Sequence, residues 1–474
     1  MKLWDIKPEP FWTDWLIFLL VIAAIAFALY ARGHEHLRAP WRQIIRRRLA
    51  MSSLVILSVY IGIGLLDSIH FRLPIESTDA AQESHYSPEV LSLLDYAVTP
   101  LREQVEKTYS MPFAAYLYTK ETIESTDGAS RREYPRLLFG GAHLADPQSQ
   151  WRADIVNTSL MGVGKGIAAA VLLTGLIMLW LSRHYHETLG VTINKVLHNR
   201  CEVPWNVILG TVSLLMILFF LALELGSKYH ILGTDKVGQD VLYLSLKSVR
   251  TGLVIGTLTT LVMLPFAILL GIMAGYFRGW IDDVIQYLYT TLNSIPGVLL
   301  IAAAILMLDV YISNHPEQFA EVNQRADARL LFLCIILGIT SWTGLCRLLR
   351  GEALKLREVD YIQAAAAFGV RHIRIISRHI LPNVMHIVLI SVVLDFSGLV
   401  LAEAVLSYVG VGVDPSMNSW GNMINGARLE MAREPIIWWS LMSAFVFMFI
   451  LVLCANLFSD AVRDAFDPRI RTGR

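Results

Sequence analysis

The chain has 474 residues, of which 55% are hydrophobic and 17% are charged. Its mean hydropathy of +0.51 argues against a soluble globular protein, and its 40 basic residues balance its 40 acidic ones, so no net charge favours nucleic acid. The four cysteines show no CxxC or metal-binding spacing, which argues against a disulfide framework and a zinc site.

Nine apolar runs are long enough to cross a bilayer as helices, which takes about 20 residues. They are residues 15–31, 49–69, 160–181, 205–225, 252–276, 291–308, 330–348, 385–409 and 436–457. The sequence therefore predicts an all-α polytopic membrane protein with about nine transmembrane helices. Pro265 and Pro296 are expected to kink their spans.

Basic residues set the expected orientation, because Arg and Lys accumulate in cytosolic loops. The loop after the first run contains Arg32, Arg38, Arg42, Arg46, Arg47 and Arg48. This predicts a cytosolic loop there, an outer N-terminus and a cytosolic C-terminus. An alternative stays open: Ala26–Ala28 could end a cleaved signal peptide, which would put the Arg-rich loop outside.

A polar stretch at residues 70–157 separates the second and third runs and is expected to form a small extracytoplasmic domain. Within it, Ser87 is the predicted N-cap of a helix with Pro88 in its first turn. Residues 1–69 then hold two spans, residues 158–228 hold two more, and residues 229–474 form a C-terminal core of five helices.

The stretch DYIQAAAAFGVRHIRIISRHILPN, residues 360–383, interrupts the apolar C-terminal part. Its three arginines would each cost about 2.5–3.5 kcal/mol inside a bilayer, so we expect it in the cytosol. Asp360 is the predicted N-cap of a first helix, with Gln363 at the capping-box position, and Gly369 its end. A second helix is expected to place Ile373, Ile376 and Ile380 on one face and to end at Pro382. On physical grounds alone, an amphipathic helix lying on lipid headgroups explains the stretch equally well.

This stretch resembles the EAA loop of ABC importer permeases. Ala364, Ala365, Gly369, Leu381 and Pro382 fit the spacing of that motif. Gln363 stands in place of the usual glutamate, and His379 in place of an isoleucine. The HILPN ending resembles the dipeptide, oligopeptide and nickel branch of these permeases.

Four further stretches resemble the same branch in the same order. They are LGTDKVGQD (232–240, with Gln239 in place of arginine), GIMAGYFRGWIDD (271–283), NSIPGVLL (293–300) and LAEAVLSYVGVGVDPSMNSWGNM (401–423). The resemblance covers about residues 229–474. The branch usually has one span before the LGTD motif, whereas this chain has four and an external domain.

The resemblance implies a C-type permease subunit of a bacterial inner-membrane importer, with di- or oligopeptides as cargo and nickel or another small solute as the alternative. It implies that residues 349–384 contact cytosolic ATPase subunits, chiefly through Asp360, Gln363, Ala364, Ala365, Gly369, His379, Leu381 and Pro382. It implies as periplasmic or pathway candidates Gly233, Thr234, Asp235, Gly238, Asp240, Glu403, Trp420 and Gly421. Asp395 is a pathway candidate on physical grounds, because an ionisable group inside a span usually faces a cavity or a partner; a hydrogen-bonded structural role is the alternative.

The partners implied are a second homologous permease, two ABC ATPases, a periplasmic or lipid-anchored substrate-binding protein and membrane lipid, but no nucleic acid. ATP is expected on the ATPases, so no cofactor, metal or catalytic residue is assigned to this chain. SLMGVGKG (159–166) lacks two residues of a P-loop and lies in an apolar run. A proton-coupled carrier that uses Asp395 and Glu403 as a relay is the alternative function.

Overall fold

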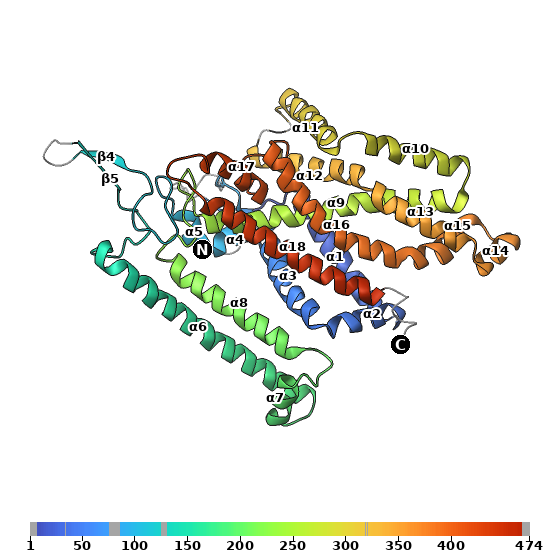
Figure 1. Ribbon diagram of the computed structural model, residues 1–474, viewed down its shortest axis with the longest axis horizontal. Helices are drawn as coiled ribbons and strands as arrows, with labels where there is room; N and C mark the ends of the chain where they lie inside the picture. Colours follow the sequence, from blue (N-terminus) through green and yellow to red (C-terminus); the bar gives the residue numbers. More distant parts are fainter. Residues whose placement is uncertain are drawn as a thin grey trace, which may run out of the picture. The chain divides into compact units, whose positions relative to one another are not determined.

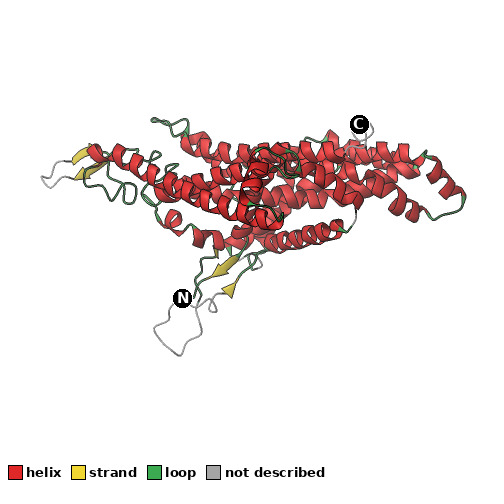
Figure 2. Ribbon diagram, turned by 90° about the horizontal axis from the view of Figure 1, so that it is seen from below, coloured by secondary structure: helices red, strands yellow, loops and turns green. Residues whose placement is uncertain are grey.

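The computed structural model describes residues 7–33, 35–74, 86–124, 130–317, 319 and 321–466. Helices make up most of this part of the chain, and strands form two small sheets (Figure 2). Nine helical stretches of the described residues are long and apolar enough to cross a membrane. The all-α polytopic prediction is therefore confirmed.

The candidate spans follow the predicted runs closely. They are α1 (Trp12–Arg32), α3 (Arg48–Asp67), α6 (Pro147–His184), α8 (Trp205–Gly226), α9 (Val241–Phe277), α11 (Gly297–Asn314), α12 with α13 (Val322–Ser341 and Thr343–Arg357), α16 (Leu381–Val409) with the helical turns before it, and α18 (Trp439–Phe466).

The two prolines differ in their effect. Pro265 lies inside α9, within its predicted span, and the kink there remains a prediction. Pro296 does not kink a span: it is the N-cap of α11 and follows the separate helix α10 (Trp280–Ser294). The prediction was wrong because residues 291–294 are the end of α10, which is amphipathic, and the ring at Pro296 cannot donate a helical N–H bond.

The chain folds into two compact units. Unit 1 comprises Met1–Pro8, Arg42–Arg250 and Asn418–Cys454, and unit 2 comprises Glu9–Trp41, Thr251–Met417 and Ala455–Arg474. The sequence-based domain ranges remain a prediction.

In unit 1, α6 and α8 lie side by side as a hairpin joined through α7 (Leu189–Leu197) (Figure 1). Two glycines allow this close packing. A Cβ on Gly162 would lie 2.9 Å from the Cα of Leu221, and one on Gly166 would lie 2.7 Å from the Cα of Ile217. Gly162 and Gly166, two of the three glycines in the stretch at residues 159–166, therefore serve helix packing, as small residues often do in membrane helices.

We call the described residues between α3 and α6, namely 68–74, 86–124 and 130–146, the α3–α6 domain. In it, β2 (His70–Arg72) pairs antiparallel with β3 (Leu91–Ser92), and β4 (Glu121–Glu124) pairs with β5 (Ser130–Glu133). The strand β1 (Lys7–Pro8), from the N-terminal segment, pairs antiparallel with the other edge of β2. The short helices α4 (Leu93–Ala97) and α5 (Thr99–Glu103) follow β3.

The helix start predicted at Ser87 was wrong. Helix α4 begins at Leu93, and its N-cap is Ser92, whose hydroxyl accepts the N–H of Asp95 while the Asp95 carboxylate accepts the N–H of Ser92. This reciprocal capping box satisfies two backbone donors at once. Residues 75–85 lie outside the described part of the chain.

A buried ion network joins α3 and α4 to α9 within unit 1. The ammonium of Lys247 lies 2.6 Å from Asp67 Oδ1 and 3.0 Å from Asp95 Oδ2. The hydroxyl of Tyr243 donates to Asp95 Oδ1 at 2.8 Å. Burial by itself would raise the pKa of Asp95, but the charge of Lys247 and the bonds from Ser92 and Tyr243 lower it.

Unit 2 contains α1, most of α2 (Glu35–Ile45) and of α9, then α10 to α16 and the end of α18. Helix α1 is anchored to α12: the backbone N–H of Thr13 donates to Asp327 Oδ2 at 3.2 Å, and its hydroxyl donates to Asp327 Oδ1. Both residues are buried. The first helix of the chain is thus part of the same compact unit as most of the helices that follow α9.

Candidate functional site

The loop predicted to contact an ATPase leaves α13 at Arg357 and enters the short helix α14 (Asp360–Ala367). Asp360 is not the N-cap, which is Val359 without a side-chain bond; Asp360 lies in the first turn, where its charge suits the helix dipole. Gln363 does not form a capping box. Its amide donates to the backbone oxygen of Glu358 at 3.3 Å.

The end of α14 matches the prediction at Gly369, which has φ +75°. The N–H of Val370 donates to Ala365 O at 3.1 Å, and the N–H of Gly369 donates to Ala366 O at 3.0 Å. These two bonds form a Schellman motif, which needs a left-handed residue and so favours glycine. The alanines before it, Ala364 and Ala365, form the last turns of α14.

The second part of the loop differs from the single α-helix that was predicted. Helix α15 (His372–Ile375) passes into a π-helical segment, Ile376–Ile380, which continues into α16. The wider π turn buries Ile375 and Ile380 and leaves Ile373 81% exposed, so the predicted apolar face was wrong. Pro382 lies in the first turn of α16 and starts that helix instead of ending one.

Side chains outside the loop hold it in place. Tyr276, at the end of α9, bonds His372 Nδ1 through its hydroxyl at 2.8 Å, and its carbonyl accepts from Arg357 at 2.7 Å. Arg350 forms a bidentate pair with Asp282 of α10, at 2.6 and 2.7 Å. The sequence motif at residues 271–283 contains Tyr276 and Asp282, but its pattern alone does not indicate these supporting bonds.

The loop exposes several apolar side chains on its surface. Tyr361, Phe368 and Ile373 are 46%, 88% and 81% exposed. The ring of His379 lies 5.8 Å from that of Tyr361, and Leu381 packs against the buried cluster beneath. Ile362, Ile375 and Ile380 of the same loop are fully buried and so anchor the exposed residues to the packed core.

In unit 1, the 232–240 loop packs tightly against the α3–α6 domain. Gly233 and Gly238 have φ +72° and +80°, and a Cβ on Gly238 would lie 1.8 Å from the backbone oxygen of Glu106. The hydroxyl of Thr234 accepts the N–H of Ser110 at 2.7 Å. Both glycines are thus required by backbone conformation and by close approach.

Three ionisable groups meet beneath this loop. His230 Nδ1 lies 2.8 Å from Asp240 Oδ2, and Nε2 lies 3.4 Å from Glu106 Oε1; all three side chains are buried. Burial lowers the pKa of His230, but the bonds to Asp240 and Glu106 outweigh it and raise the pKa to about 9. The imidazolium is therefore the form that the two carboxylates stabilise at neutral pH.

The two aspartates of the loop have backbone roles. Asp240 Oδ1 accepts the N–H of Leu242 at 2.8 Å and so caps α9. Asp235 Oδ1 accepts the N–H groups of Val237 and Gln239 at 3.0 and 2.9 Å, and burial raises the pKa of Asp235. Both aspartates therefore stabilise the backbone of the loop and the start of α9.

The last loop contributes to the same region. Trp420, in α17 (Trp420–Glu430), is buried and donates from Nε1 to the backbone oxygen of Ser245 at 3.2 Å. Gly421 follows it in the buried first turn. Trp439 at the start of α18 donates to Thr234 O at 2.9 Å.

The two acidic residues of α16 do not form a site together. Glu403 is buried and accepts from the hydroxyl of Ser407 at 2.7 Å, one turn further along the helix. Asp395 is half-buried. Eight residues of helix separate them by about 12 Å, too far for direct proton transfer.

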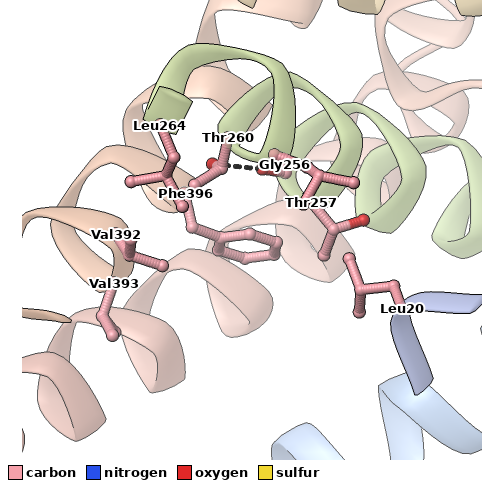
Figure 3. Close-up of a pocket in the computed structure, with 9 residues that line it drawn as sticks. Leu20, Gly256, Thr257, Thr260, Leu264, Val392, Val393 and Phe396 are labelled. Carbon is pink, nitrogen blue, oxygen red and sulfur yellow. Dashed lines mark hydrogen bonds between the residues drawn. The ribbon is translucent and has the colours of Figure 1, made fainter. Parts of the chain in front are cut away.

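A cavity of about 310 Å³ lies within unit 2 between α1, α9 and α16. Figure 3 shows the ring of Phe396 directed from α16 toward Gly256 of α9, where a Cβ would lie 2.5 Å from the ring. Leu20 of α1 also lines the space. The lining is mostly apolar, with Thr257 and Thr260 as its polar side chains, and it does not include Asp395.

The chain resembles known transport proteins. Residues 267–472 match the family described as "Binding-protein-dependent transport system inner membrane component". The oligopeptide transport system permease protein OppC of Mycobacterium tuberculosis is 33% identical over 52% of this chain and 78% of its own length. The glutathione permease protein GsiD of Pectobacterium atrosepticum is 30% identical (52% and 75%), and the dipeptide permease protein DppC of Bacillus subtilis 26% (51% and 69%). The chain therefore belongs to the family of inner membrane components of binding-protein-dependent transport systems.

Proposed function

We propose that the chain is a permease subunit of an ATP-driven importer of short peptides in a bacterial inner membrane. It forms the pathway together with a second, related permease. Two cytosolic ATPase subunits bind and hydrolyse ATP, and a substrate-binding protein delivers the peptide. In this proposal the chain itself holds no cofactor and catalyses no reaction.

The observation that carries the proposal is the loop at residues 358–383. It presents exposed Phe368 and Ile373 on a base of buried isoleucines, next to the small residues of α14. Such a firm apolar surface suits a groove on an ATPase subunit. A partner can drive the permease only if it contacts the loop differently in its two nucleotide states, and a rigidly supported loop passes that difference on to α16.

The proposal places the α3–α6 domain and the 232–240 and 410–421 loops outside the membrane, where peptide is handed over. Asp395, half-buried on α16, is the candidate for the pathway. Peptide is the favoured cargo because the relatives that match over half of the chain are named for oligopeptide, glutathione and dipeptide transport.

A cross-linking experiment tests the proposal. Ala366 is exposed on α14, whereas the natural cysteines are buried or half-buried. The tagged Ala366→Cys chain is purified in mild detergent from its own host and cross-linked. Recovery of an ATPase and a second permease, with the ATPase joined at position 366, supports the proposal.

Tyr96→Cys provides the matched control, because Tyr96 is 59% exposed in the domain proposed to lie outside. It should give no ATPase adduct. The opposite outcome is that the chain is recovered alone and that uptake is abolished by a protonophore but not by ATP depletion. That result would contradict the importer proposal and favour the proton-coupled carrier. Uptake of radiolabelled dipeptide or nickel then identifies the cargo.

A further inference from the structure

The α3–α6 domain contains a cavity of about 710 Å³, which lies entirely within unit 1. Its walls are Met111, Pro112, residues 114–118, Tyr134, the first turns of α6 and Pro435. Ligand pockets usually measure about 300–1,000 Å³, so this one can hold an amino-acid side chain together with its backbone groups.

Aromatic rings form much of the wall, and internal hydrogen bonds fix two of them. The hydroxyl of Tyr118 donates to the backbone oxygen of Ile436 at 3.1 Å, and Trp151 Nε1 donates to Phe113 O at 2.6 Å. Tyr116 and Tyr134 add two further rings. A wall held in this way is formed before a ligand arrives, which lowers the entropy cost of binding.

The charge of the lining has one sign. Arg152, on the second turn of α6, lines the cavity, and no carboxylate does. Among the described residues Arg152 has no hydrogen-bond or ion-pair partner, whereas the nearby Arg136 is satisfied by backbone oxygens such as Ala142 O at 3.1 Å. The ammonium of Lys120 lies 5.3 Å from the centre of the ring of Tyr134, which lines the cavity.

We propose that this cavity binds a carboxylate that carries an aromatic or bulky apolar side chain, namely the C-terminal residue of a short peptide. Arg152 pairs with the carboxylate, and the rings of Tyr116, Tyr134 and Trp151 contact the side chain. A guanidinium matches a carboxylate with two parallel hydrogen bonds, and the aromatic faces supply apolar contact. The identity of the ligand as a peptide rests on the proposed function; the site itself rests on the cavity and its charge.

Binding is measured by isothermal titration calorimetry on the full chain in lipid nanodiscs. The probes are alanyl-phenylalanine and its C-terminal amide, which differ in the carboxylate alone. We expect the acid to bind at least roughly tenfold more tightly than the amide, because a charge-assisted bond is lost. Arg152→Gln should reduce the affinity for the acid to that for the amide and leave the affinity for the amide unchanged.

Two further variants complete the test. Arg132→Gln removes the same charge from β5, outside the cavity lining, and should bind like the wild type. Tyr134→Ala should weaken acid and amide alike. Equal binding of acid and amide, an unchanged affinity in Arg152→Gln, or no binding to the wild type would overturn the proposal.

The test separates this site from the proposed function. ATP-dependent peptide uptake by the assembled transporter is measured in parallel. Uptake without binding to the isolated chain rejects the cavity and leaves the importer in place. Binding that depends on Arg152, in a system without ATP-dependent peptide uptake, supports the cavity and rejects the importer.

Discussion

Individual glycines of α6 can be separated by what surrounds them. Gly166 packs against the backbone of Ile217, whereas a Cβ on Gly164 meets nothing within 4 Å. We expect Gly166→Ala to destabilise the α6–α8 hairpin by about 1–3 kcal/mol through overpacking, and Gly164→Ala to be neutral or slightly stabilising. Thermal unfolding of the purified variants in detergent measures the difference. Equal melting temperatures would show that the hairpin tolerates a wider separation.

The His230 cluster makes a prediction about pH. Its pKa of about 9 in the folded chain exceeds the ordinary value of 6.5. The imidazolium therefore stabilises the fold fully below about pH 6.5, and this contribution is lost as the pH rises through about 9. It amounts to about 3 kcal/mol at most.

His230→Gln should accordingly flatten the fall of the melting temperature between pH 6.5 and 9, whereas His198→Gln, at an exposed position, should leave it unchanged. Glu106 and Asp240 are the carboxylates that face the ring. A profile of His230→Gln identical to that of the wild type would mean that the ring is neutral in the folded chain.

At the scale of elements, a substitution in the α14–α15 loop should change partner binding without changing the stability of the chain. Phe368 is 88% exposed, so Phe368→Ala should leave the melting temperature of the isolated chain unchanged. In the importer the same change should weaken ATPase association roughly 5- to 100-fold, as loss of a buried aromatic at an interface does. Tyr96→Ala removes a comparably exposed ring and serves as control. Pull-down titration with the purified ATPase would contradict the proposal if both variants bound like the wild type.

The elements themselves show what sequence reasoning can reach. The spans were predicted because apolar length belongs to one segment and needs no partner. Helix α6 begins at Pro147, before the predicted residue 160, because its first turns are polar and hydropathy does not register them. The start at Ser92 was missed because Asp67 and Lys247, far away in sequence, favour that turn.

Only the local features of the candidate site could be predicted, because contacts between distant parts of the chain are not visible in the sequence. Gly369 was predicted correctly because a left-handed helix end is local. The buried face of the loop was not predicted correctly. It depends on the π-helical segment, which follows from packing of Ile375 and Ile380 against α13 and α16, and the spacing of residues along the chain does not reveal such packing. The cluster of His230 with Glu106 needed a contact across more than a hundred residues.

At the scale of the whole molecule, the N-terminal half and the start of α9 depend on each other. Without residues 1–228, Lys247 loses Asp67 and Asp95, and His230 loses Glu106. Leaving a buried charge unpaired costs about 3–5 kcal/mol. We therefore expect residues 229–474 expressed alone to be degraded, and co-expression of residues 1–228 as a separate chain to restore them.

Immunoblots of the membrane fraction measure both arms of this experiment. A core that accumulates alone, with the melting temperature of the co-expressed pair, would show that the additional spans and the α3–α6 domain are dispensable attachments. It would also show that the buried network adds nothing to the stability of α9.

The π-helical segment at Ile376–Ile380 has one consequence for the geometry of the loop. A π turn is an α turn with one additional residue, and each residue of an α-helix advances its direction by about 100°. Deleting one residue here should convert the segment to regular helix and leave the direction of the preceding residues about the axis of α16 nearly unchanged, because the turn remains one full turn. The segment thus accommodates one additional residue between the loop and the span, while the exposed surface of the loop keeps its direction relative to α16.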